Sequence, residues 1–135
     1  MINTNWGNDM KKNSVGWFEI YVNDMKRAKN FYEIVFQKQL EELKSPEDHL
    51  EMWLFPGDME SYGANGALVK MEGFSVSGQN SVLIYFSCKD CSVEEKRVSE
   101  SGGRVEKSKF SIGQYGFISL VYDTEGNMIG LHSME

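Results

Sequence analysis

The stretch WFEIYVND, residues 17–24, carries a carboxylate in the middle of an apolar run. Strict alternation divides its side chains between two faces of a strand, with Phe18, Ile20 and Val22 on one and Trp17, Glu19 and Tyr21 on the other. The first face predicts contact with a hydrophobic core. On the second face, Glu19 could accept a hydrogen bond or a proton from a ligand. The other elements of the fold must therefore supply the side chains that lie next to Glu19.

The first half of the chain predicts one strand, one helix and three further strands. The helix is expected over MKRAKNFYEIVF, residues 25–36, because its apolar side chains recur at helical spacing and Asp24 can cap its start. The three strands are expected in KQLEEL, LEMWLF and GALVKM. The Gly/Ser-rich residues 72–80 then predict a linker.

The second half repeats this order. SVLIYFSCKD predicts a strand and CSVEEKRVSES a helix, in which Ser92 and Glu95 have the spacing of a capping box. Three strands follow, around RVEKS, GFISLVY and NMIGLHS. A βαβββ pattern that occurs twice predicts an α+β fold of two tandem modules that must share a surface, because one module cannot bury both faces of its sheet. The modules are expected over residues 15–72 and 81–135, after a disordered N-terminal segment over residues 1–14.

The composition excludes several classes of protein. The chain has 135 residues and a formal net charge of −6, which argues against a nucleic-acid-binding surface. No apolar run approaches the roughly 20 residues that a membrane-spanning helix needs. Two cysteines and no export signal predict a cytoplasmic protein.

Two motifs carry a resemblance to a known family. FEIYVNDMKRAKNFYEIVF and DTEGNMIGLHS, in this order, resemble the strand–helix and final-strand motifs of the vicinal oxygen chelate superfamily, which includes glyoxalase I, bleomycin-resistance proteins and extradiol dioxygenases. The resemblance covers residues 15–133 and implies that the sheets of the two modules form a curved cleft and that the chain is a homodimer. Gln37 and Thr124 depart from the family pattern, which usually has Gly and Pro there. Both departures are expected in surface turns.

The resemblance does not extend to the metal ligands of the family enzymes. The four ligand positions fall on Trp17, Leu83, Gly130 and, by the loosest match, Leu68. A divalent cation needs nitrogen, oxygen or sulfur donors, which none of these side chains supplies as a ligand. The sequence therefore predicts that the usual metal site is lost and that no cofactor is bound.

A second layer of polar residues is expected two positions further along each strand, on the same face. It comprises Glu19, Lys70, Tyr85 and His132. In one hypothesis this layer binds a small polar ligand, with Glu19 as base or acceptor, Lys70 and Tyr85 as donors, and His132 as a proton carrier. In the other, the cluster satisfies itself through a Glu19–Lys70 ion pair and a hydrogen bond from Tyr85. A divalent metal at this displaced layer stays open, because glutamate and histidine are ordinary ligands.

Three other features are candidates for function. CKDC, residues 88–91, has the spacing of a redox motif, but a helix that starts at Ser92 leaves both cysteines outside it and favours an ordinary buried thiol at Cys88. One of Met52 and Trp53 is expected to face the cleft, and sheet packing and ligand stacking both explain Trp53. Tyr115, in the loop GQYGF, could cover the cleft as a lid.

These observations lead to three functional hypotheses. The first is a glyoxalase/bleomycin-resistance-like protein that binds a small organic molecule in the cleft between the modules without a metal, using Trp17, Lys70, Tyr85, Trp53 and Tyr115. The second is a lyase-, isomerase- or dioxygenase-like enzyme that uses Glu19 and His132 for acid–base chemistry, with or without a metal. The third is a non-catalytic interaction domain. A redox role of Cys88 and Cys91 is a further alternative.

Overall fold

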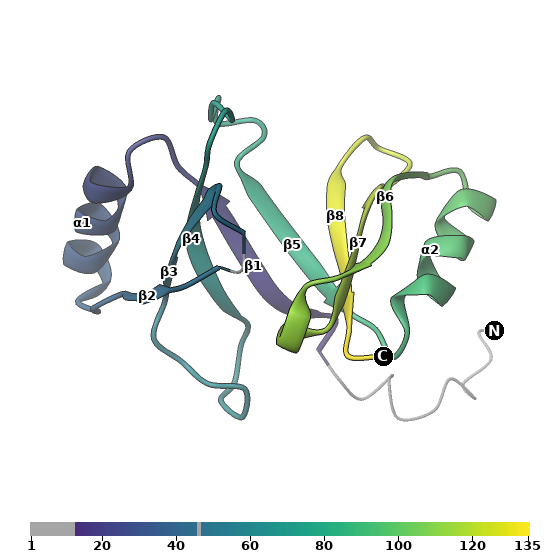
Figure 1. The fold of residues 1–135 in the computed structure, drawn as a ribbon, viewed down its shortest axis with the longest axis horizontal. Coiled ribbons are helices and arrows are strands. Elements are labelled where there is room, and N and C mark those ends of the chain that lie inside the picture. The colour runs from purple at the N-terminus through teal and green to yellow at the C-terminus, as the bar shows by residue number, and fades with distance from the viewer. Residues whose placement is uncertain (1–12, 46) are drawn as a thin grey trace. The chain divides into compact units, whose positions relative to one another are not determined.

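The computed structural model describes residues 13–45 and 47–135, and its elements follow the order βαβββ twice (Figure 1). The first module contains β1 (Val15–Tyr21), α1 (Met25–Phe36), β2 (Glu41–Leu43), β3 (Leu50–Leu54) and β4 (Asn65–Met71). The second contains β5 (Val82–Ser87), α2 (Cys91–Glu100), β6 (Arg104–Ser111), the short 3₁₀ helix η2 (Gly113–Tyr115), β7 (Phe117–Tyr122) and β8 (Met128–Ser133). This confirms the predicted α+β fold of two tandem βαβββ modules.

The structure forms two compact units that nearly coincide with the modules. One unit spans residues 17–84, and the other comprises residues 85–135 together with the described residues 13–16. The predicted linker, residues 72–80, contains no helix or strand and lies between β4 and β5. Most of the predicted N-terminal segment, residues 1–12, lies outside the described part of the chain.

In the first module, α1 covers one face of a four-stranded sheet with the order β2-β3-β4-β1 (Figure 1). β1 and β4 are parallel, whereas β3 is antiparallel to β2 and β4. The core between helix and sheet is built on Met25, Leu40 and Leu68. α1 begins after Asp24, whose side chain accepts a hydrogen bond from the backbone N–H of Arg27 at 3.0 Å.

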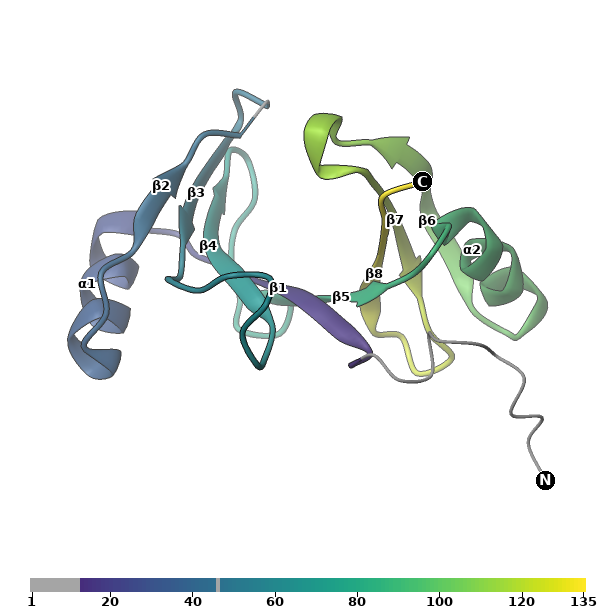
Figure 2. The same ribbon diagram turned by 90° about the horizontal axis from the view of Figure 1, so that it is seen from below.

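In the second module, α2 covers one face of a sheet with the order β5-β8-β7-β6, as the turned view also shows (Figure 2). β5 and β8 are parallel, and β8, β7 and β6 are antiparallel to their neighbours. Cys91, Val121 and Leu131 form the buried core, with Phe86, Cys88 and Ile129 packed against it. The expectation that Cys88 lies on the core face is therefore confirmed.

The start of α2 differs from the prediction. Asp90, and not Ser92, is the N-cap, and its carboxylate accepts from the N–H of Ser92 at 3.0 Å and from its hydroxyl at 2.7 Å. Glu95 does not close a capping box, because its carboxylate accepts from the N–H of Lys109 and the hydroxyl of Ser119. Cys91 thus becomes the first residue of the helix.

Neither helix in the described residues is long and apolar enough to cross a membrane.

Candidate functional site

Glu19 is held on the sheet face that α1 does not cover, which we call the helix-free face of the first module. Its side chain is almost buried, with 8% of the residue exposed. Trp17 Nε1 donates to Glu19 Oε2 at 3.1 Å, and the hydroxyl of Tyr21 donates to Oε1 at 2.8 Å. The three residues alternate along β1, so both aromatic side chains flank the carboxylate from the same strand. Trp17, Glu19 and Tyr21 therefore lie on one face of β1, as alternation predicts.

The Tyr21 hydroxyl is a fixed donor to this carboxylate. Burial, followed by the negative charge and the hydrogen bond of Glu19, raises the pKa of Tyr21 far above its ordinary value. The phenol therefore stays protonated at every physiological pH. The ring of Tyr21 also forms an edge-to-face pair with Phe74, whose ring centroid lies 5.6 Å away.

Apolar side chains surround the carboxylate on this face. β4 places Ala67 beside Glu19 and Val69 beside Tyr21, and these two residues are 0% and 1% exposed. β3 adds Met52 next to Val69. Glu19 is thus a hydrogen-bonded carboxylate beside buried apolar side chains.

The prediction that Lys70 shares a face with Glu19 is wrong. In the parallel pairing of β1 and β4, Ala67 and Val69 lie beside Glu19 and Tyr21, so Lys70 points to the opposite face with Leu68. Lys70 is exposed there beside Glu51 of β3. This placement is incompatible with the expected Glu19–Lys70 ion pair.

The error comes from a one-residue slip between the two modules. β5 and β8 place Tyr85 beside Gly130, just as β1 and β4 place Glu19 beside Ala67. Ala67, and not Leu68, is therefore the counterpart of Gly130, and Val69 is the counterpart of His132. Leu68 belongs instead to the core under α1.

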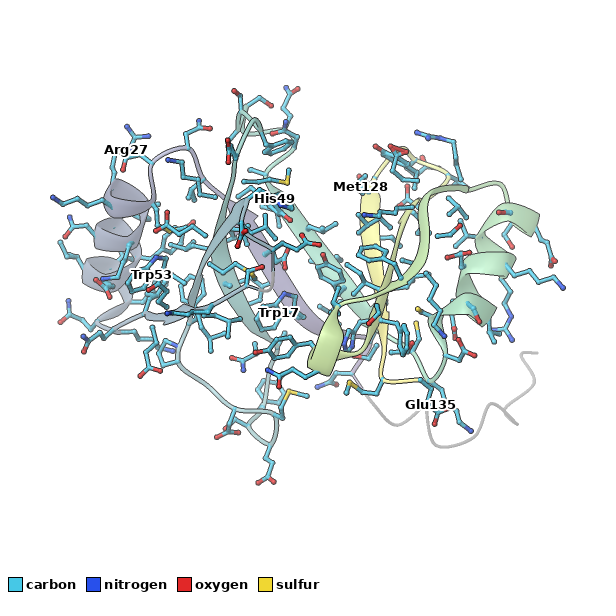
Figure 3. All side chains as sticks on the ribbon, viewed as in Figure 1. Trp17, Arg27, His49, Trp53, Met128 and Glu135 are labelled. Atoms are coloured by element: carbon cyan, nitrogen blue, oxygen red, sulfur yellow. The ribbon has the colours of Figure 1, made fainter. Side chains whose placement is uncertain are left out.

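The register also decides between Met52 and Trp53. Trp53 lies beside Leu68 on the α1 side and packs against that core, whereas Met52 lies on the helix-free face. The ammonium of Lys29 stands 4.7 Å from the Trp53 ring centroid, and Trp53 Nε1 donates to Glu51 at 2.9 Å. Figure 3 shows Trp53 beside α1 and Trp17 on β1. The candidacy of Trp53 for ligand stacking on the Glu19 face is therefore a wrong prediction, and its sheet-packing interpretation is right.

In the second module, Tyr85 and His132 share the sheet face opposite α2, as predicted. β5 and β8 pair Tyr85 with Gly130 and Ser87 with His132, and β7 adds Ile118 beside His132. Tyr85 is 6% exposed, and its ring covers Gly130 so closely that a Cβ at this glycine would overlap the ring. We call this surface the helix-free face of the second module.

His132 is oriented by the backbone of η2. Its Nε2 lies 2.6 Å from the carbonyl oxygen of Tyr115. A carbonyl can only accept, so Nε2 carries a proton, and Nδ1 is an acceptor when the ring is neutral. The Tyr115 side chain itself is 40% exposed, and its role as a lid stays a prediction.

The residues at the family's ligand positions do not fit a metal. The indole N–H of Trp17 donates to Glu19. The side chains of Ala67 and Leu83 contain no atoms that can ligate a metal. At Gly130, the Tyr85 ring occupies the space that a ligating side chain would need. Across residues 13–45 and 47–135, no group of three or more His, Cys, Asp or Glu side chains is arranged to hold a metal ion.

Sequence reasoning missed two residues of these faces. Alternation places Tyr21 on the face of Glu19, and the two-residue spacing is the signal that the two side chains can form a hydrogen bond. Ile118 could not be found, because its position beside His132 depends on the pairing of β7 with β8.

Comparisons with known proteins agree with this fold. Residues 14–131 match the family model described as Glyoxalase/Bleomycin resistance protein/Dioxygenase superfamily. A comparison with curated protein sequences gave no match.

Several solved structures share the fold at low sequence identity. A hypothetical protein from Bacillus halodurans is 10% identical with a TM-score of 0.68, over 90% of this chain and 94% of that one. A Streptomyces coelicolor methylmalonyl-CoA epimerase variant, in complex with 2-nitronate-propionyl-CoA, is 17% identical with a TM-score of 0.65, over 90% and 96% of the two chains. Methylmalonyl-CoA epimerase from Mycobacterium tuberculosis is 17% identical with a TM-score of 0.65, over 100% and 93%. The match of the family model over most of the chain, on a fold of two βαβββ modules, shows that the chain belongs to the glyoxalase/bleomycin resistance protein/dioxygenase superfamily.

Proposed function

We propose that the chain binds a small organic molecule on the helix-free face of its first module and that no metal takes part. The observation that carries this proposal is the Glu19 carboxylate, which is almost buried and oriented by Trp17 and Tyr21 within an apolar face. A carboxylate that is oriented by its own strand is prepared to accept a hydrogen bond from a ligand without rearrangement. The proposed ligand therefore has an apolar body and a hydrogen-bond donor.

The second module supports the same chemistry. When the ring of His132 is neutral its Nδ1 atom can accept, since Nε2 is engaged by the Tyr115 carbonyl. Ile118 and the Tyr85 ring add apolar surface. Polar groups that are few and fixed, within an apolar surface, are typical of small-molecule sites.

The absence of ligand-type side chains at Trp17, Ala67, Leu83 and Gly130 supports binding without a metal. The overlap that any side chain at Gly130 would have with the Tyr85 ring supports it further. The proposal therefore assigns recognition to hydrogen bonds and apolar contact alone.

A ligand screen on chelator-treated protein tests the proposal. Small organic molecules are screened by heteronuclear NMR in the presence of EDTA, and dissociation constants of hits are measured for variants. Trp17→Phe keeps an aromatic ring but loses the indole N–H, and Glu19→Gln loses the charge; we expect both to weaken binding about tenfold or more. Trp53→Phe is the matched control, because Trp53 also donates to a glutamate two residues away but lies on the α1 side.

Hits that bind only after a metal is added would contradict the proposal. So would hits whose affinity falls as much in Trp53→Phe as in Trp17→Phe, because the site would then not be the helix-free face.

An acid–base enzyme is a second candidate, and the geometry of His132 favours it. A histidine whose Nε2–H is held by a carbonyl has a defined orientation and leaves Nδ1 as the atom for proton transfer with a bound molecule. In this case a bound molecule would be converted, and the pH–rate profile would lose one limb in His132→Gln and the other in Glu19→Gln. Binding without turnover would leave the first proposal standing.

We also propose that the chain is a homodimer, as the family resemblance implies. Light scattering during size-exclusion chromatography would give twice the chain mass, and a single chain mass would contradict this proposal.

A further inference from the structure

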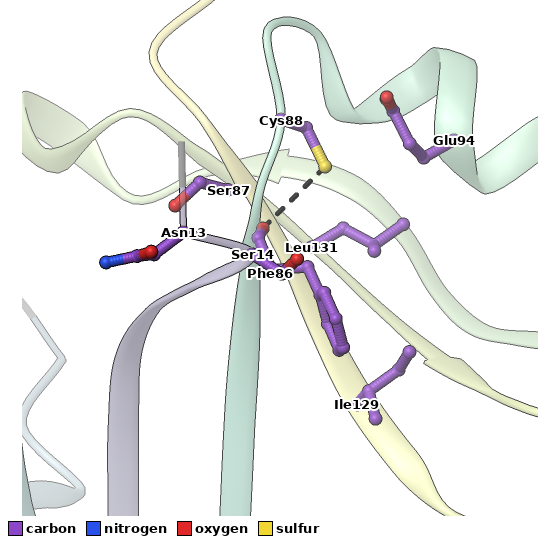
Figure 4. A pocket seen from close by; sticks show the side chains of 8 residues that line it. All are labelled: Asn13, Ser14, Phe86, Ser87, Cys88, Glu94, Ile129 and Leu131. Atoms are coloured by element: carbon purple, nitrogen blue, oxygen red, sulfur yellow. Dashed lines mark hydrogen bonds between the residues drawn. The ribbon is translucent and has the colours of Figure 1, made fainter. Parts of the chain in front are cut away.

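A groove of about 330 Å³ lies on the α2 side of the second module (Figure 4). Its apolar walls are the side chains of Phe86 on β5 and of Ile129 and Leu131 on β8. Asn13 and Ser14 also line it, and the Ser14 carbonyl accepts from the N–H of Ser87 at 2.9 Å, which fixes this segment beside β5. With Glu94 of α2, the groove is built from four segments of one unit.

Two acidic groups, a thiol and a carboxyl, add polarity to the lining. The thiol of Cys88 donates to the carbonyl of Phe86 at 3.7 Å. Burial, and after it the neighbouring Glu94 carboxylate, raise the pKa of Cys88 to about 12, so the thiol stays neutral. Cys88 therefore contributes a small, uncharged surface to the groove.

Glu94 contributes a carboxylate whose neighbouring donor, the Cys88 thiol, is weak. It projects from α2 into the lining of the groove, and its Oε1 atom is shielded from solvent without a hydrogen-bond partner in the described part of the chain. A shielded carboxylate oxygen without a strong donor is costly, whereas a charged donor would offset that cost through a strong hydrogen bond. The groove is therefore incomplete at Glu94 Oε1.

We propose that this groove is a second ligand site, which takes a small protonated amine with an apolar body. The ammonium group would donate to Glu94 Oε1, and the apolar body would lie against Phe86, Ile129 and Leu131. The volume has room for an apolar body of one ring or a short aliphatic chain. The negative charge of Glu94 opposes anionic ligands, and a lone carboxylate with a neutral thiol is a poor set of ligands for a metal.

The groove is independent of the helix-free face. Phe86 and Leu131 alternate along β5 and β8 with Tyr85 and His132, so the two sets of side chains leave opposite faces of the same sheet. Variants of one surface leave the other intact, so the two proposals can fail separately.

Benzylamine is the probe for the test, with benzyl alcohol as its uncharged analogue of the same shape. Each is titrated at pH 7 into the full chain labelled with ¹⁵N and observed by ¹H–¹⁵N NMR. We expect shift changes at Phe86, Cys88, Glu94 and Ile129, and an affinity for benzylamine at least tenfold higher than for benzyl alcohol. Glu94→Gln should remove this difference, whereas Glu100→Gln, the same charge change at an exposed position of α2, should preserve it.

A second variant tests the groove itself. Ile129→Trp should fill the groove and abolish binding of both probes, provided that its NMR spectrum shows a folded protein; Ile129→Phe serves if Trp does not fold. The proposal is overturned if benzylamine binds Glu94→Gln as tightly as the parent chain. It is also overturned if the shift changes centre on Tyr85 and His132, or if the groove shows nuclear Overhauser contacts with residues 1–12 and no binding of the amine.

Discussion

At the scale of single residues, the buried carboxylate of Glu19 depends on the hydrogen-bond donors beside it. A buried carboxylate is tolerated only where donors meet it, and here Trp17 and Tyr21 supply two from the same strand. The chain contains a second Trp–Glu pair with the same spacing, Trp53 and Glu51, but Glu51 is exposed. The two pairs therefore allow the effect of burial on one interaction to be measured.

Glu19→Gln should lower the free energy of unfolding by about 1–2 kcal/mol. The amide keeps one acceptor oxygen, but its NH₂ group then faces one of two donors. Glu51→Gln should change stability by less than about 0.5 kcal/mol, because solvent replaces the lost interaction. Urea denaturation of the three proteins at pH 7 measures both values, and equal effects of the two substitutions would contradict the burial argument.

The raised pKa of Tyr21 predicts a loss of stability in alkali. The folded protein keeps the phenol protonated beyond the ordinary pKa of 10.0, whereas the unfolded chain loses the proton near that value. The stabilisation is thus complete below about pH 10 and declines above it, by up to about 1.4 kcal/mol per pH unit. Tyr21→Phe should flatten this decline.

Denaturant unfolding between pH 9 and 11 measures the decline for the parent chain and for Tyr21→Phe. Tyr62→Phe is the control, since Tyr62 is 99% exposed and its substitution should leave the slope unchanged. An identical slope in all three proteins would contradict the role of Tyr21.

At the scale of elements, sequence patterns predicted what is local and failed where strand pairing decides. The face of Glu19 follows from alternation within β1 alone. The face of Lys70 depended on aligning β4 with β8, where a shift of one residue moves every side chain to the other face. The start of α2 depended on choosing between Asp90 and Ser92, two good caps that stand two residues apart.

The end of α1 carries a local strain that the sequence indicated. Gln37, where the family pattern has Gly, adopts a left-handed conformation with φ of 53°, and its side-chain amide donates to the carbonyl of Ile34 at 2.6 Å. A residue with a Cβ pays about 1 kcal/mol in this conformation. Gln37→Gly should therefore stabilise the chain by about 0.5–1 kcal/mol, measured by urea denaturation. Lys38→Gly is the control and should not stabilise, since Lys38 has no positive φ.

Between β5 and β8, the Tyr85 ring fills the space beside Gly130, where the family resemblance expects a metal ligand. A Cβ at Gly130 would overlap the Tyr85 ring, so Gly130→Ala should destabilise the chain by about 1–3 kcal/mol. Tyr85→Ala removes the ring, and in this background Gly130→Ala should cost much less. A double-mutant cycle by urea denaturation measures the coupling, and additive effects would contradict a direct overlap.

At the scale of the whole molecule, the repeated βαβββ order was predictable because each module is defined by short-range patterns, and two matching modules reinforce each other. The chemistry of the candidate site was harder to predict from the sequence. The family's fold is present, but the side chains at its ligand positions are apolar or a glycine, and only strand pairing shows that the last of them is Ala67 and not Leu68. Membership of the family and retention of its metal are thus separate questions.

This separation predicts that divalent metals leave the stability of the chain unchanged. A metal that binds only the native state adds about 2.7 kcal/mol to the free energy of unfolding when its free concentration is 100 times its Kd. Thermal melts resolve a shift of this size. Since Trp17, Ala67, Leu83 and Gly130 provide no ligands, Ni²⁺, Zn²⁺, Mn²⁺, Fe²⁺ and EDTA should all give the same melting temperature. Elemental analysis of protein purified without a chelating tag should find far less than one metal per chain. One metal per chain, with a stabilisation that disappears in Glu19→Gln and His132→Gln, would show instead that these two residues form a displaced metal site.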